Sequence, residues 1–303
     1  MATTARPGPG VEKSGISRTL RTYLELAKLR IVTLLLFTTV TAMVVAAQGI
    51  PKIGILLPTL LGGALSAMGA SAINQYLDRD LDAKMTRTSR RPIPSGRVAP
   101  INALIFGLSL IVWSTLILWL WVNPLASLLA LGGAIYYVII YTALLKRNTV
   151  VNIVIGGGAG AMPVLVGWAA VTGTLSYEAL ILFAIVFYWT PPHSWALALL
   201  VNSDYARANV PMMPVARGED VTRRQILLYS IQLFIISLTP VLFGFLSGIY
   251  LVAAVGLGLG LIRASVVLLR RQDGASARKT YKFSTSYLAF LFLAMILDTL
   301  LLA

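Results

Sequence analysis

The stretch SAINQYLDRDLDAKMTRTSRRP, residues 71–92, carries three aspartates and five basic residues directly after an apolar run. Within it, Asn74, Asp78 and Asp82 follow one another at intervals of four residues. If the preceding helix continues through them, each step turns about 40° and rises about 6 Å. All three side chains would then lie on one face at the end of the helix. Asp80 would point elsewhere, where we expect it to be solvated or ion-paired.

Oxygen ligands on one helix face suit Mg²⁺, which binds one or two carboxylates, keeps several waters and takes substrate phosphates as further ligands. The arginines that follow, including Arg87 and Arg91, can bind phosphate oxygens through the guanidinium fork. The pattern therefore predicts a diphosphate site with Mg²⁺ held by Asn74, Asp78 and Asp82. The structural alternative is a solvated helix end whose aspartates and arginines pair with one another.

The helices that carry these residues are those of a membrane protein. The 303 residues are 57% hydrophobic and 12% charged, with a mean hydropathy of +0.82, whereas soluble domains are about 45–50% apolar and about 25% charged. Runs of 18 or more mostly apolar residues are typical of transmembrane helices. Nine are predicted, at residues 31–49, 53–77, 101–122, 125–145, 150–172, 177–200, 226–245, 248–269 and 284–302.

The basic residues indicate the orientation of these spans. Of the 25 Lys and Arg residues, 23 fall in the first thirty residues or in the loops after spans two, four, six and eight. The positive-inside rule makes this side cytoplasmic. The sequence thus predicts a multi-pass protein of the cell (inner) membrane, with the N-terminus and acidic loops in the cytoplasm and the C-terminus opposite. The net charge of +14 is then mainly an orientation signal, with anionic lipid or substrate as a second use, and no nucleic acid is implied.

Two long cytoplasmic loops have similar sequence patterns. The loops after spans two and six each open with carboxylate and continue through a two-proline segment, and together they hold five of the seven aspartates. This weak repeat predicts two four-helix halves plus a ninth helix, with two acidic clusters close enough to hold two ions across one diphosphate. Residues 1–20 are predicted to be a disordered basic tail leading to a short interfacial helix. Residues 21–303 then form one intramembrane domain.

Two sequence features exclude other chemistry. The chain has no cysteine, which excludes disulfides, thiolate metal sites and a cysteine nucleophile. The GGGAG stretch at 156–160 looks like a phosphate loop, but it lies in mid-span and lacks the accompanying lysine. Small residues of this kind let membrane helices approach closely, and we expect that role here.

Four stretches resemble the UbiA-type intramembrane prenyltransferases, and among them the branch that acts on protohaem IX. They are NQYLDRDLDAKMTRTSRRP at 74–92, YTALLKRNTVVNIVIGGGAGAMPVLVGW at 141–168, TPPHSWALAL at 190–199 and DYARANVPMMPV at 204–215. The similarity spans about residues 20–300. It implies an all-α fold of nine transmembrane helices around a lipid-accessible cavity.

The resemblance also implies an activity. This is the Mg²⁺-dependent transfer of a farnesyl group from farnesyl diphosphate to a vinyl group of protohaem IX. Water completes the addition, and the products are haem O and diphosphate. The haem O serves haem-copper oxidases, with haem A synthase as a candidate partner.

The resemblance also implies which residues of this chain bind the metal. Asn74, Asp78 and Asp82 match the first aspartate-rich motif, and Asp204 matches the second. The second motif of the wider superfamily usually has several aspartates, and only Asp204 remains here. A second ion would therefore be held more weakly.

Other residues are expected to stabilise the charges that develop when the allylic carbon–oxygen bond ionises. The candidates for binding the leaving diphosphate are Arg87, Arg91, Lys146, Arg147 and Arg217. For the last three, a role in membrane orientation alone is the alternative. The carbocation can be stabilised by an aromatic face, and Tyr141 is the preferred candidate because it lies about one turn before Lys146.

His193 is the only histidine and follows Pro191 and Pro192. The two prolines are expected to bend and break span six. A polar residue at such a point is a functional candidate, either as a ligand of haem iron or as a group that positions the vinyl. The alternative is a packed histidine bonded to the carbonyls freed at the kink.

Two other functions remain open. A related prenyltransferase could act on a quinone or chlorophyll precursor, although TPPHSWALAL and the single aspartate of the second motif argue against it. A secondary transporter would also be polytopic, but transporters place polar groups near the bilayer midplane. Here the charges lie at one face.

Overall fold

The computed structural model describes residues 15–302, and these fold almost entirely into helices. The long helices are α2 (Leu29–Ala47), α3 (Ile53–Leu77), α5 (Pro100–Trp121), α6 (Pro124–Ile135), α8 (Asn152–Thr172), α9 (Tyr177–Leu200), α12 (Glu219–Leu242), α13 (Gly248–Arg271) and α14 (Gly274–Leu302). α6 continues through a π-helix, η1 (Tyr136–Leu145), into α7 (Lys146–Asn148). The remaining short helices are α1 (Gly15–Ala27), α4 (Arg79–Lys84), α10 (Asn202–Arg207) and α11 (Met213–Arg217).

Nine helical segments within residues 15–302 are long and apolar enough to cross a membrane. This confirms the predicted all-α fold and the number of spans. The seventh and ninth spans begin earlier than predicted, at Glu219 instead of 226 and at Gly274 instead of 284. Hydropathy marks only the part of a helix that meets lipid, whereas α12 and α14 continue beyond it through charged residues such as Arg224 and Lys282.

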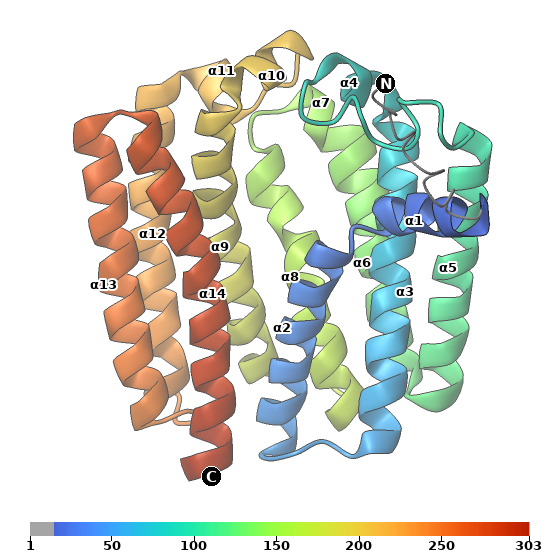
Figure 1. Cartoon of the computed structure of the whole chain (residues 1–303). Coiled ribbons are helices and arrows are strands. Elements are labelled where there is room, and N and C mark those ends of the chain that lie inside the picture. The colour runs from blue at the N-terminus through green and yellow to red at the C-terminus, as the bar shows by residue number, and fades with distance from the viewer. Residues whose placement is uncertain (1–14, 303) are drawn as a thin grey trace, which may run out of the picture.

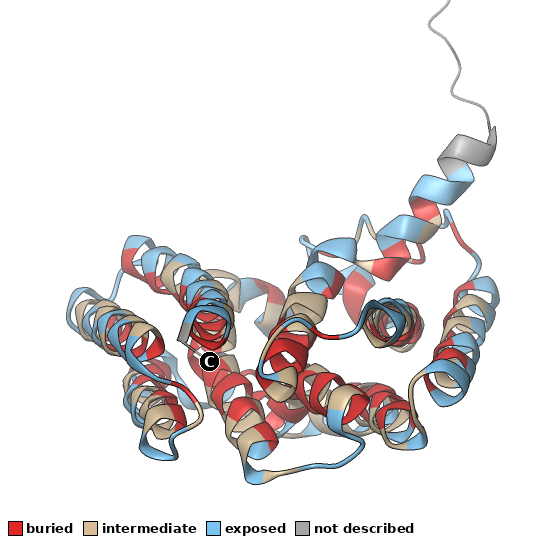
Figure 2. Ribbon diagram, turned by 90° about the horizontal axis from the view of Figure 1, so that it is seen from below, coloured by how far each residue is buried: buried red, intermediate tan, exposed pale blue. Residues whose placement is uncertain are grey.

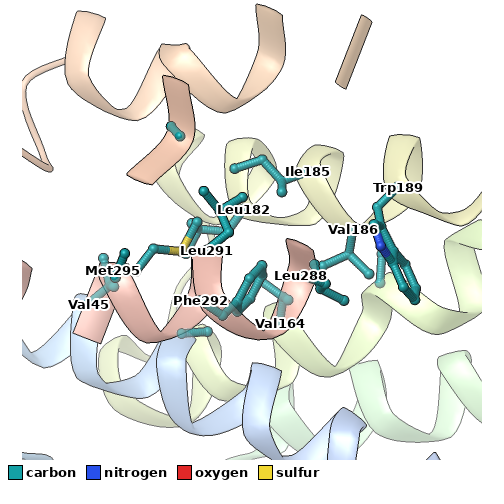
Figure 3. Close-up of a cluster of buried hydrophobic side chains, with 14 of the residues drawn as sticks. Val45, Val164, Leu182, Ile185, Val186, Trp189, Leu288, Leu291, Phe292 and Met295 are labelled. Atoms are coloured by element: carbon teal, nitrogen blue, oxygen red, sulfur yellow. The ribbon is translucent and has the colours of Figure 1, made fainter. Parts of the chain in front are cut away.

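The long helices form a ring in chain order (Figure 1). Each packs against the next, and α14 packs against α2 and so closes the ring. Buried residues lie mainly on the faces turned inward, as Figure 2 shows. Across the interior, α2 contacts α8 and α9 contacts α14. Figure 3 shows the apolar cluster formed there, which includes Val45, Val164, Leu182 and Phe292.

Glycines allow several helix pairs to approach closely. A Cβ on Gly69 of α3 would lie 2.6 Å from the carbonyl oxygen of Gly107 in α5, and a Cβ on Gly107 would lie 2.8 Å from that of Gly69. In the GGGAG stretch, a Cβ on Gly156 would lie 2.2 Å from Cδ2 of Tyr141. The stretch therefore serves helix packing, as predicted.

The short helices α4, α10 and α11 lie together at one end of the ring, opposite the end of α14 (Figure 1). We call this the loop end. α1 lies across the long helices (Figure 1), as expected of an interfacial helix. It begins at Gly15, five residues before the predicted end of the disordered tail. The rest of that tail, residues 1–14, lies outside the described residues.

α9 runs without interruption through Pro191 and Pro192. The prediction that these prolines break span six is therefore wrong. Both are buried, and α9 packs against α8, α12 and α14. Neighbouring helices of this kind hold a membrane helix together where proline removes backbone donors.

Candidate active site

The predicted acidic face forms where α3 meets α4. The backbone N–H of Asp78 donates to the carbonyl of Asn74 at 2.9 Å, and that of Asp82 donates to the carbonyl of Asp78 at 2.8 Å. Helical hydrogen bonding thus continues through Asp78, so the three side chains share a face. They are 3%, 0% and 2% exposed for Asn74, Asp78 and Asp82, whereas the Asp80 side chain is 54% exposed. These burial values confirm the expected separation of Asp80 from the other three residues.

The π-helix η1 and the first residue of α7 bring two polar residues to this face. Lys146 Nζ donates to Asp78 Oδ2 at 2.5 Å, and Asn74 Nδ2 donates to Thr142 Oγ1 at 3.1 Å. Asn74 and Asp78 are four residues apart, and their partners Thr142 and Lys146 are also four residues apart. The wider turn of η1 is visible at its end, where the backbone N–H of Lys146 donates to the carbonyl of Tyr141 five residues back. Segments of π-helix occur frequently at functional sites.

Two arginines hold the remaining aspartates of the first motif. Arg91 Nη1 donates to both carboxylate oxygens of Asp82, at 2.9 and 2.8 Å. Arg147 forms two 2.9 Å bonds to Asp80 and donates to the carbonyl of Leu77 at 2.6 Å. The Arg147 hydrogen bond holds the pKa of Asp80 below its usual value. Asp80 is thus ion-paired, one of the two states expected for it.

Lys28, at the start of α2, completes the cluster. Its Nζ donates to Asn74 Oδ1 at 3.1 Å. Burial, assisted by the positive charges of Arg91 and Lys146, lowers the pKa of Lys28 to about 7. The sequence had shown Lys28 only as an orientation signal, because nothing in its surroundings points to a residue 46 positions away.

Asp204 connects the second acidic loop to the first. It accepts hydrogen bonds from the backbone N–H groups of Thr86 at 3.3 Å and Arg87 at 3.2 Å, and Arg207 donates to it. Desolvation alone would raise the pKa of Asp204, but these N–H groups, together with Arg207, hold it below its usual value. Asp204 thus reaches the loop that follows α4, which confirms that the two loops meet.

The residues fit a divalent cation bound together with a substrate. Asp78 Oδ1 is buried and accepts no hydrogen bond, although Arg147 Nη2 lies 3.9 Å away. A buried carboxylate oxygen without a partner is suited to bind a cation. Among residues 15–302, no three acidic or histidine side chains gather as a metal site, and Asp82 and Asp204 are each paired with an arginine. Mg²⁺ takes few protein ligands and completes its shell with water and phosphate, so Asp78 Oδ1 is the oxygen that fits this role.

His193 lies apart from the acidic cluster, between α9 and α14. Its Nδ1 is 2.9 Å from Ser284 Oγ. Its ring stacks on Trp189 with centroids 4.3 Å apart, and lies 4.8 Å from the ring of Tyr281. The partner of the ring is thus a hydroxyl of α14 and not a carbonyl freed by the prolines.

The two remaining candidates, Tyr141 and Arg217, lie at different distances from the acidic cluster. Tyr141 stacks on Tyr137 with centroids 5.7 Å apart and lies over Gly156, one turn from the Lys146–Asp78 pair. Arg217 is exposed at the end of α11 and makes no ion pair within residues 15–302. No contact connects it to the acidic residues, whereas Arg207, which the sequence reasoning missed, binds Asp204 directly. Arg207 stands three residues after Asp204, and this helical spacing is the feature of the sequence that could have predicted their ion pair.

Comparison with known proteins gives the family. A family described as the UbiA prenyltransferase family matches residues 35–295. A protein of Chloroflexus aurantiacus named "Protoheme IX farnesyltransferase" is 52% identical over 279 residues, which cover 92% of this chain and 48% of that protein. One of the same name from Symbiobacterium thermophilum is 52% identical over 281 residues, covering 92% of this chain and 94% of that protein. The chain spans about half the length of several curated relatives that it matches.

A solved structure shows the same fold. The UbiA homologue from Archaeoglobus fulgidus bound to DMAPP and Mg²⁺ superposes with a TM-score of 0.65, at 17% identity, covering 90% of this chain and 99% of that one. The nine spans, the two meeting loops and the family match over most of the chain agree with one another. This multi-pass membrane protein belongs to the UbiA prenyltransferase family.

Proposed function

We propose that this protein transfers farnesyl from farnesyl diphosphate to a vinyl group of protohaem IX, giving haem O and diphosphate. Two relatives about half identical to the chain carry the name of that activity. The observation that carries the proposal is the Asp78 site. Its carboxylate is buried at the end of a membrane helix, with one oxygen on Lys146 and the other without a hydrogen bond.

Asn74, Asp78 and Asp82 would hold Mg²⁺, with Asp204 as ligand for any second ion. When bound, Mg²⁺ supplies Lewis-acid stabilisation of the charge that builds on the diphosphate. A relative of the same fold binds a prenyl diphosphate together with Mg²⁺. The three carboxylates Asp78, Asp82 and Asp204 are paired with Lys146, Arg91 and Arg207 respectively.

These cations would change partners when the substrate binds. Lys146, Arg91 and Arg147 lie within reach of the acidic face, and Arg87 follows it on the first loop. A diphosphate bridged to the carboxylates by metal would take over these donors, which would stabilise the leaving group as its negative charge grows. Arg217 would join them only if its loop moved.

The reaction breaks the bond between farnesyl C1 and the diphosphate oxygen, and both electrons leave with diphosphate. The allylic cation is attacked by the vinyl π electrons, and a new carbon–carbon bond forms. Water then adds to the resulting cation and loses a proton, which leaves a hydroxyethylfarnesyl side chain. Tyr141 would stabilise the first cation through its ring face and exclude water beside Lys146.

The proposal is tested by mass spectrometry of haem extracted from cells that express the chain. We expect haem O to accumulate with the wild type and to be absent with Asp78→Ala. Asp220→Asn is the matched control, because Asp220 is an exposed aspartate of the same end that pairs only with Arg223. Haem B alone in wild-type cells that contain the folded protein would refute the activity, and a farnesylated quinone would identify the sister reaction.

The proposal extends to orientation and pathway. The loop end would face the cytoplasm of a cell (inner) membrane, since most of the basic residues gather there. Haem O would then pass to the enzymes that complete the haem of haem-copper oxidases, with haem A synthase as a candidate partner.

A further inference from the structure

Lys28 brings a positive charge into the acidic cluster without an acidic partner of its own. Its Nζ donates to Asn74 Oδ1 at 3.1 Å, and it forms no ion pair within the described residues 15–302. By contrast, Lys146, Arg91 and Arg147 are each paired with an aspartate. Burial and the neighbouring positive charges lower the pKa of Lys28, so the nearby aspartates do not compensate its charge. An ammonium group has three N–H donors, and in the described part of the chain only one of them has a partner.

The backbone around Lys28 is fixed to the helix that carries the first acidic motif. Lys28 has φ 49° and ψ 54°, in the left-handed region that residues with a side chain rarely adopt. Two residues earlier, the carbonyl of Leu26 accepts hydrogen bonds from Ser71 Oγ at 3.0 Å and Gln75 Nε2 at 2.8 Å, both on α3. Strained residues of this kind persist only where the surrounding structure fixes them, and they are frequent at active sites. The α1–α2 junction thus holds the Lys28 side chain beside the first motif.

Asn74 lies between Lys28 and Asp78, and these two neighbours fix the direction of its amide. The Lys28 ammonium can only donate, so it contacts Asn74 Oδ1. The carboxylate of Asp78 accepts from Asn74 Nδ2 at 2.8 Å on the other side. An amide binds a cation through its oxygen, so the proposed role of Asn74 as a metal ligand requires the oxygen that Lys28 occupies. Lys28 must then exchange Asn74 for another acceptor within reach of its fixed backbone.

We propose that Lys28 binds the diphosphate of the prenyl donor directly, through a hydrogen bond from Nζ to a phosphate oxygen. A lysine ammonium is a compact charge on a flexible stem, so the exchange of acceptor needs no movement of the backbone. The contact adds positive charge where negative charge grows as the leaving group departs. This inference rests on the proposed function and adds a residue to its site. The alternative is that Lys28 only orients Asn74 and never touches the substrate.

The test measures binding of the donor instead of turnover. The full chain in phosphatidylcholine nanodiscs is titrated by calorimetry with farnesyl S-thiolodiphosphate, an unreactive analogue, in the presence of Mg²⁺ and without haem. Lys28→Gln removes the charge but keeps N–H groups that can donate to Asn74. We expect its Kd for the analogue to rise about tenfold or more, because a charge-assisted hydrogen bond is lost. The Ki for inorganic diphosphate, measured by competition with the analogue, should rise in parallel.

Two further variants separate the contact from net charge and from folding. Lys279→Gln removes an exposed lysine near the start of α14. It lowers the net charge by the same amount as Lys28→Gln and should bind the analogue as the wild type does. Lys28→Gly relieves the left-handed backbone, which glycine adopts without strain. It should keep the thermal unfolding midpoint of the wild type and still bind the analogue as weakly as Lys28→Gln.

Three results would overturn the assignment. An unchanged Kd in Lys28→Gln would leave Lys28 with no more than the orientation of Asn74. Weaker binding of the analogue with an unchanged Ki for inorganic diphosphate would place the loss at the farnesyl chain, and an equal loss in Lys279→Gln would make it an effect of net charge. The proposed function can fail separately, since binding that depends on Lys28 without haem O formation would refute only the reaction. Haem O formation by the wild type, with normal analogue binding by Lys28→Gln, would refute only the role of Lys28.

Discussion

Lys146 Nζ lies 2.5 Å from Asp78 Oδ2 and joins two residues that are 68 positions apart in sequence. Their side chains are only 13% and 1% exposed. A charge pair this deeply buried is costly to break, because removal of one partner leaves the other charged and poorly solvated. The pair therefore connects α3 to the end of the π-helix, and it also keeps a cation next to the proposed metal ligand.

We expect Lys146→Gln to lower the free energy of unfolding by about 3–5 kcal/mol, the usual cost of removing one partner of a buried pair. Thermal unfolding of the detergent-solubilised protein measures this as a lower midpoint. Arg97→Gln is the control, since Arg97 pairs with Glu25 at a site where both side chains are more than a third exposed, and such pairs contribute about 0–1 kcal/mol. Adding Asp78→Asn to Lys146→Gln should restore part of the loss. Equal unfolding midpoints for Lys146→Gln and Arg97→Gln would show that the buried pair contributes no more stability than the exposed one.

Chelation of divalent cations should stop the release of diphosphate from farnesyl diphosphate, and added Mg²⁺ should restore it. Asp78→Asn removes the charge of the proposed ligand. This variant should therefore need at least tenfold more Mg²⁺ for half-maximal release of diphosphate. A diphosphate-release assay in purified membranes measures both effects, with Asp220→Asn as the unchanged control. Full activity in the chelated wild type would exclude the metal requirement.

The Tyr141 ring rests directly on Gly156, where a Cβ would lie 2.2 Å from ring carbon Cδ2. Gly156→Ala should therefore displace the ring and reduce haem O formation at least tenfold. Overpacking of this kind also costs about 1–3 kcal/mol of stability. Gly160, one turn further along α8, has nothing within 4 Å of its Cβ position, so Gly160→Ala should behave as the wild type. The check is haem O yield per folded protein, and equal yields would remove Tyr141 from the proposed site.

Hydropathy and spacing were enough to predict the nine spans and the face formed by Asn74, Asp78 and Asp82. Both depend on local order, namely a run of apolar residues and a helix that continues at four-residue steps. Lys146 was expected at the same diphosphate site, but its direct ion pair with Asp78 was not predictable, because it depends on which helices become neighbours. The π-helical segment YYVIIYTALL also carries no sequence signal that separates it from α-helix. Pro191 and Pro192 misled for the same reason, since the packing around α9 overrides their local preference.

The absence of cysteine from the chain makes its orientation directly measurable. Ser95→Cys places a thiol in the exposed loop before α5, and Thr174→Cys places one in the turn between α8 and α9. A membrane-impermeant maleimide should label Thr174→Cys in intact spheroplasts, and should label Ser95→Cys only after lysis, because the basic loops are expected inside. The reverse pattern would invert the proposed topology. Labelling of the unmodified chain gives the background.

We propose that Ser284 acts through His193 as a positioning residue, since its hydroxyl oxygen lies 2.9 Å from His193 Nδ1. Ser284→Ala removes that hydrogen-bond partner, so the imidazole is no longer held in one orientation toward the haem. We expect a shifted Soret maximum of bound haem B and a several-fold higher KM for haem, with the KM for farnesyl diphosphate unchanged. Ser284→Thr retains the hydroxyl and should restore the wild-type spectrum. A residue that only fills space would give a normal spectrum with alanine, and that result would end the positioning role.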